Sequence, residues 1–115
     1  MEPIGDNRAI YRQFIRDLLT DYATIEPAYG EFEVEVIFDT EHDRYQVVSF
    51  GWEDNRWVHH CSMHLEIRDG KIWIFHNATE RSLERELVDL GVPKGDIVFG
   101  FCPPYLRETT DYGVG

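Results

Sequence analysis

The chain has 115 residues, of which 43% are apolar, so its length and composition predict a single soluble domain over residues 1–115. Its 22 acidic residues against 11 Lys plus Arg give a net charge of −11, which repels a phosphate backbone. The composition therefore argues against direct nucleic-acid binding. It favours either acidity that confers solubility or a negative surface that recognises a basic partner protein.

The first expected element is a helix that Asp6 or Asn7 caps and Pro27 stops. Its apolar residues recur at three- and four-residue spacing, as on one face of a helix, and are Ile10, Tyr11, Phe14, Ile15, Leu18 and Tyr22. A cationic stripe runs along the same helix and consists of Arg8, Arg12 and Arg16. We interpret it either as a solvated face near glutamates of the sheet or as a docking stripe for an acidic patch on a neighbouring subunit.

Four β-strands are expected between Phe32 and His76, because apolar residues alternate through this stretch. Their apolar faces are Val34, Val36 and Phe38, then Val48, Phe50 and Trp52, then Cys61, Met63, Leu65 and Ile67, and finally Ile72 and Ile74. Asp54-Asn55 and Asp69-Gly70 tolerate the positive φ of a two-residue hairpin turn. The last three strands should therefore form an antiparallel meander.

These turns also predict the register of the sheet. The expected opposed pairs are Trp52 with Trp57, Phe50 with His59, Val48 with Cys61, Ile67 with Ile72, Leu65 with Ile74, and Met63 with His76. Between Asp39 and Arg44, only an odd number of loop residues places Val36 on the same face as Val48. We therefore expect a loop of three or five residues there.

A second helix is expected from about Thr79 to a glycine stop at Gly91, with Pro93 beyond it. It should bury Leu83, Leu87, Val88 and Leu90. Trp73 and Phe75 project from the second face of the sheet. Either the chain covers this face itself, or the face forms the interface of a homodimer or higher oligomer.

The segment from Cys102 to Gly115 is expected to be extended, because Pro103-Pro104 favours that conformation. Its aromatic and cationic side chains are Tyr105, Arg107 and Tyr112. We predict an ordered arm that packs on the domain or on a second subunit and contributes to the partner-binding surface. The alternative interpretation is a frayed tail.

A metal or catalytic site has weak candidates in His59, Cys61 and His76, which share one sheet face in the expected register. Residues two apart on a strand are separated by roughly 6.5 to 7 Å at the backbone, so His59 and Cys61 need a third ligand. The sequence contains no HExxH, CxxC or GxSxG motif. We therefore favour packed side chains and expect neither a cofactor nor catalysis.

Three features of the sequence indicate a cytoplasmic protein without a membrane span. The N-terminus lacks a basic start and an apolar run, and the longest apolar stretches have the length of a strand. Cys61 and Cys102 form no disulfide framework, which agrees with a reducing compartment.

Short motifs follow one another in a specific order along nearly the whole chain, from about Tyr11 to the C-terminus. They include Tyr29-Gly30, Thr40-Glu41, Arg44-Tyr45-Gln46, Gly51-Trp52, Asp69-Gly70-Lys71-Ile72-Trp73-Ile74, Gly91-Val92-Pro93-Lys94 and Pro103-Pro104. In this order the chain resembles the XisI family. With the residue patterns, the resemblance predicts an α+β fold with an N-terminal helix, a four-stranded antiparallel meander, a second helix and an extended C-terminal segment.

The resemblance also implies a function. XisI-like proteins are controlling factors for excision of the fdxN element in heterocyst-forming cyanobacteria, where they act alongside the nuclease-like XisH and a separate recombinase. This implies a non-enzymatic accessory factor whose partner is a XisH-like protein or another basic, DNA-handling protein. Two alternatives remain open: an antitoxin-like inhibitor of a XisH-like nuclease, and a small enzyme or metal-binding protein that uses His59, Cys61 and His76.

Overall fold

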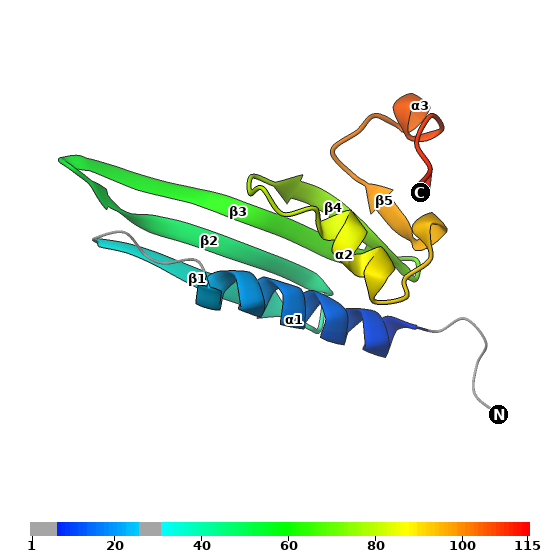
Figure 1. Cartoon of the computed structure of the whole chain (residues 1–115), viewed down its shortest axis with the longest axis horizontal. Helices are drawn as coiled ribbons and strands as arrows, with labels where there is room; N and C mark the ends of the chain where they lie inside the picture. The colour runs from blue at the N-terminus through cyan, green and yellow to red at the C-terminus, as the bar shows by residue number, and fades with distance from the viewer. Residues whose placement is uncertain (1–6, 26–30) are drawn as a thin grey trace.

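The computed structural model describes residues 7–25 and 31–115 and shows helices packed on a long twisted sheet (Figure 1). Its elements in chain order are α1 (Arg8–Ile25), β1 (Glu31–Asp39), β2 (Arg44–Glu53), β3 (Arg56–Arg68), β4 (Lys71–Asn77), α2 (Leu83–Asp89), the 3₁₀ turn η1 (Lys94–Asp96), β5 (Ile97–Phe99) and α3 (Pro104–Arg107). The predicted α+β class is confirmed. Pro27 and Tyr29-Gly30 lie outside the described residues, as does Asp6.

The sheet has five strands in the order β1-β2-β3-β4-β5, not four. The first four strands are antiparallel as predicted, whereas β5 lies parallel to β4. A parallel neighbour requires a crossover connection, and the segment that contains α2 supplies it. The C-terminal segment is not extended throughout, because Pro104 begins the short helix α3.

Both predicted hairpin turns are confirmed. Asp54 has a φ of 57°, and the strands on either side pair Glu53 with Arg56. Asp69 and Gly70 have φ values of 52° and 75°, as a type I′ turn requires, and they bring Arg68 opposite Lys71. The second helix begins at Leu83, later than predicted, and the chain leaves it through Gly91, which has a φ of 108°.

The loop between β1 and β2 has an even number of residues, so the prediction of three or five is wrong. Residues 40–43 connect Asp39 to its pairing partner Arg44, and Val36 lies opposite Val47. Tyr45 and Val47 are fully buried, whereas Trp52 is 49% exposed. The prediction failed because β2 is apolar on both faces, and the helices cover the face that carries Tyr45.

Two β-bulges change which side chains share a face. The first bulge lies on β3. Val48 of β2 pairs with Cys61 and Val47 of β2 pairs with Met63, so Ser62 is an extra residue on β3. This places Cys61 and Met63 on opposite faces, contrary to the prediction.

The second bulge lies on β4, where Leu65 pairs with Ile74 and His64 pairs with His76. The extra residue is Phe75, and Met63 therefore lies opposite Asn77. The predicted pair of Met63 with His76 is wrong for this reason.

The core lies between the two longer helices and one face of the sheet, which we call the inner face; the opposite face is the outer face. α1 packs against β1, β2 and β3. The buried residues of this core are Tyr11, Ile15, Leu19, Tyr45, Val47, Met63, Leu65, Ile67, Ile72, Ile74, Leu83, Leu87, Val92 and Ile97. Leu90, which the sequence predicted to be buried, is 46% exposed, and Ile10 from the apolar positions of the first helix is 52% exposed. No described helix is long and apolar enough to cross a membrane.

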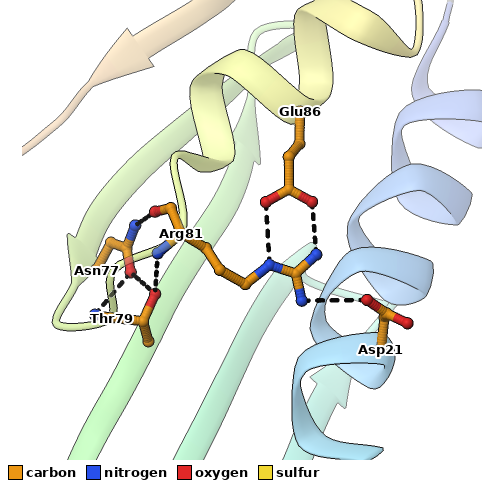
Figure 2. A network of polar contacts seen from close by, with 5 residues as sticks. All are labelled: Asp21, Asn77, Thr79, Arg81 and Glu86. Carbon is orange, nitrogen blue, oxygen red and sulfur yellow. Dashed lines mark hydrogen bonds and ion pairs between the residues drawn. The ribbon is translucent and has the colours of Figure 1, made fainter. Parts of the chain in front are cut away.

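A polar network centred on Arg81 joins α2 to α1 (Figure 2). Its guanidinium donates from Nη2 and Nε to Glu86 at 2.5 and 3.0 Å, and Nη1 lies 3.2 Å from Asp21 on α1. Asn77 donates to the Arg81 carbonyl at 2.6 Å and accepts from the Thr79 hydroxyl, also at 2.6 Å. The network therefore holds the turn between β4 and α2 as well as the two helices.

Replacing Arg81 by methionine is expected to destabilise the protein by about 1 to 2 kcal/mol, because it removes charge-assisted hydrogen bonds from a guanidinium that is only partly solvated. Urea unfolding followed by circular dichroism measures the loss. Arg85→Met is the matched control, since Arg85 is exposed on α2, four residues after Arg81. Equal unfolding midpoints for the two variants would contradict a stabilising role of the network.

Candidate protein-interaction surface

The β2–β3 hairpin projects beyond β4 and β5 and gives the molecule its length of 54 Å against 34 and 24 Å (Figure 1). Its outer face carries four rings, Phe50, Trp52, Trp57 and His59, which we call the aromatic ladder. Trp52 and Trp57 meet edge to face at a centroid distance of 5.3 Å, and Phe50 stacks with His59 at 6.0 Å.

The aromatic ladder is in contact with water. Trp52 is 49% exposed and Trp57 is 51% exposed, although each is among the largest apolar side chains of the chain. Exposed aromatic rings that gather on one surface are typical of protein interfaces, because their burial gives a large apolar contribution at a small cost in side-chain entropy. The ladder is the first part of the candidate surface.

A row of carboxylates borders the ladder on β1. Glu33 lies opposite Phe50, and Glu35 lies opposite Val48, so both carboxylates are on the outer face. Both side chains are exposed, and no described residue forms an ion pair with either of them. The surface therefore combines apolar rings with negative charge that nothing in the described chain neutralises.

A polar cluster occupies the outer face farther along β3. Glu66 is 7% exposed and bonds His64 Nε2 at 2.8 Å and Arg68 Nε at 2.9 Å. Burial alone would raise the pKa of Glu66, but the bonds from His64 and Arg68 outweigh burial and lower this pKa. We did not predict the cluster, although the alternation of His64, Glu66 and Arg68 with core residues is its sequence signal.

Trp73 and Phe75 lie beside this cluster, and the chain itself covers them. Their rings stack at 5.8 Å. Arg107 lies over the Trp73 ring at 5.0 Å, and Arg68 lies over Phe75 at 4.8 Å. Trp73 is only partly exposed, and its indole Nε1 is buried and has no hydrogen-bond partner among residues 7–25 and 31–115. Arg107 and Arg68 thus cover this face in part, and a subunit interface at Trp73 and Phe75 stays a prediction.

The C-terminal segment packs on the domain, as predicted. Arg107 Nε donates to the carbonyl oxygens of Phe99 and Cys102 at 3.2 and 3.0 Å, and Gly113 forms a bridge to Val98. Tyr112 packs edge-on against Phe99 at 4.9 Å. Tyr105 is 70% exposed, so among the aromatic candidates of this segment it is the one still accessible to a partner.

The arginine stripe of α1 is used in part to anchor the loop after β1. Arg12 Nε and Nη2 donate to both carboxylate oxygens of Asp43 at 2.6 and 3.1 Å, and this bonding holds the pKa of Asp43 below its usual value. Arg8 adds to the same effect through its charge. Arg16 donates to Gln13 at 2.9 Å. Contact of the stripe with a partner stays a prediction.

The weak metal candidates share the outer face but do not form one cluster. His59 and Cys61 are neighbours on β3, whereas His76 lies opposite His64, three residues beyond Cys61. Within residues 7–25 and 31–115, no group of three His, Cys, Asp or Glu side chains is placed to hold a metal ion. Cys61 donates to the Met63 carbonyl at 3.1 Å, and burial raises the pKa of its thiol, which keeps it protonated.

Comparison with known proteins identifies the fold. The model of the family described as XisI protein matches residues 5–114. This chain belongs to the XisI family. The resemblance that the motif order indicated is thus confirmed, and no curated protein matches the sequence significantly.

Two solved structures share the XisI fold. A XisI-like protein from Anabaena variabilis ATCC 29413 is 42% identical and superposes with a TM-score of 0.90, covering 94% of this chain and 99% of that chain. The fdxN element excision controlling factor XisI from the same strain is 28% identical with a TM-score of 0.83, covering 96% of this chain and 100% of that chain.

Proposed function

We propose that this member of the XisI family is a non-enzymatic accessory factor that controls excision of a DNA element through contacts with another protein. The process is supported by the similar structure described as an fdxN element excision controlling factor. The mechanism is supported by one observation above all, the half-exposed aromatic ladder beside carboxylates that form no ion pair with a described residue. Such a surface suits a protein partner better than a nucleic acid.

The proposed partner is a basic, DNA-handling protein, either a XisH-like protein or the recombinase. A net charge of −11 favours encounter with a positively charged surface and speeds association at low salt. The same contact would serve an antitoxin-like inhibitor, if the acidic surface covers the DNA-binding face of a nuclease. The two roles differ in whether the partner's nuclease activity falls when the complex forms.

The test is co-expression of this chain with its chromosomal neighbour, followed by affinity purification. We expect a complex that elutes together and weakens with added salt. Trp52→Ala with Trp57→Ala should weaken it about tenfold or more, because buried aromatic residues dominate interface energies. Phe101→Ala is the control, since Phe101 is 59% exposed in a separate part of the chain, and Tyr105→Ala tests the C-terminal candidate.

The isolated chain should not bind duplex DNA at physiological salt, because it presents few cations that displace counterions. A gel-shift assay measures this. Sub-micromolar affinity for DNA would overturn the proposed mechanism. Light scattering of the same sample decides whether a homodimer forms, which stays a prediction here.

A further inference from the structure

The strand β1 forms one edge of the sheet and is nine residues long. In the described part of the chain, β2 is the only strand that pairs with it. An edge strand presents unpaired backbone N–H and C=O groups to which another strand can bind. At the opposite edge, β5 has three residues and is bridged by Gly113, so β1 is the longer template.

We propose that β1 binds an extended strand of the partner protein, with Lys or Arg at alternate positions, as a sixth strand of the sheet. This inference rests on the proposed function, because it names the surface and the segment through which a basic partner is held. The mode of binding is strand addition, in which main-chain hydrogen bonds supply affinity and alternate side chains supply specificity.

The charges of β1 select the sequence of the added strand. Glu33 and Glu35 lie two residues apart on the outer face, so their backbone positions are about 7 Å apart. A strand paired with β1 places its own alternate side chains beside them at the same spacing. Opposite charges in such cross-strand pairs are stabilising, and both carboxylates are exposed without an ion-pair partner among the described residues.

The inner face of β1 selects the intervening residues. Val34, Val36 and Phe38 pack against the core but are only partly buried. Apolar side chains at every second position of an added strand would extend this inner layer and remove more of these three residues from water. The recognised pattern is therefore an alternation of basic and apolar residues.

A second copy of this chain does not fit the same edge. Two copies related by a two-fold axis would pair β1 with β1 antiparallel. Every register that matches the two faces and pairs at least three outer-face residues of each copy opposes acidic side chains, such as Glu35 with Glu35 or Glu33 with Asp39. Directly opposed like charges are destabilising, so the edge disfavours self-association and favours a basic strand.

The first experiment uses two fluorescein-labelled peptides of identical composition, Thr-Lys-Val-Lys-Val-Lys-Thr and Thr-Lys-Lys-Val-Val-Lys-Thr; in the second, no two lysines are two residues apart. Fluorescence polarisation measures their binding to the full chain at physiological salt. We expect the alternating peptide to bind at least about fivefold more tightly, because only it aligns its charges with Glu33 and Glu35. Equal binding, or no saturable binding of the alternating peptide, overturns the inference.

The second experiment changes the edge. Glu33→Lys with Glu35→Lys should weaken binding of the alternating peptide about tenfold, since two attractive pairs become repulsive. Glu80→Lys with Glu108→Lys is the control of the same net charge, because both residues are exposed and lie outside β1. Equal losses in the two variants would show non-specific attraction and overturn the inference.

Hydrogen exchange supplies a readout of position. Binding of the alternating peptide should slow exchange of alternate β1 backbone amides, whose N–H groups gain a hydrogen-bond partner. Protection elsewhere but not on β1 overturns the inference.

The co-purification assay distinguishes failure of the strand-addition inference from failure of the proposed function. If the neighbour binds the wild-type chain and Glu33→Lys with Glu35→Lys alike, the inference fails while the proposed function stands. If the neighbour does not bind, the proposed function fails, and the peptides alone decide the inference.

Discussion

Replacing Ile15 by alanine is expected to lower the free energy of unfolding by about 3 to 4 kcal/mol. Ile15 is fully buried in the middle of α1, where its side chain belongs to the core under the sheet. The substitution removes apolar contacts and leaves a cavity that rigid neighbouring strands cannot fill. Urea unfolding at neutral pH measures the change, which is a large share of the stability of a domain of this size.

Ile10→Ala provides the control on the same helix. Ile10 is 52% exposed, so the same change of side chain should cost less than about 1 kcal/mol. The pair of variants separates burial from helix propensity, because alanine favours the helix equally at both sites. Similar losses at Ile10 and Ile15 would mean that α1 does not pack on the sheet as described.

Replacing Gly113 by alanine is expected to destabilise the protein by about 2 to 3 kcal/mol and to loosen the C-terminal segment. An added Cβ would lie 2.4 Å from the carbonyl oxygen of Gly95 and 3.1 Å from Cγ2 of Val98. The first of these atoms belongs to the backbone and cannot rotate away. The bridge between Gly113 and Val98 must therefore open or shift.

The measurements are urea unfolding and tryptophan fluorescence. Loosening should shift the emission of Trp73 to longer wavelength, because Arg107 and Gly115 no longer cover its ring. Gly95→Ala is the control, since no atom lies within 4 Å of its added Cβ. Deletion of residues 103–115 should reproduce the loss. A truncated chain that unfolds at the same urea concentration as the full chain would refute a stabilising role of the segment.

Local turn chemistry made the hairpins predictable. Asp54-Asn55 and Asp69-Gly70 determine the backbone at their own positions, and pairing next to each turn followed by counting outward. Counting failed at Ser62 and Phe75, because a bulge leaves no fixed residue signature and shifts every later pair by one.

Which face of β2 is buried was not predictable, because periodicity identifies faces but not what covers them. Val47 and Val48 are equally apolar, yet one is fully buried and the other faces outward with the aromatic ladder. The pairing of Trp52 with Trp57 was predicted correctly, but the exposure of their side chains to water was not predicted. β5 was missed because three residues are too few to show a period.

The parallel pairing of β4 with β5 sets the order in which the fold can assemble. Strands β1 to β4 are joined by hairpin turns, so the residues that pair are near each other in the sequence. Contacts of this kind form quickly during folding. β5 reaches its place only after the chain has passed through α2 and η1, which costs more loop-closure entropy. β5 and the C-terminal segment that follows it should consequently fold last. They should also unfold first, which would expose Trp73 before the rest of the sheet unfolds.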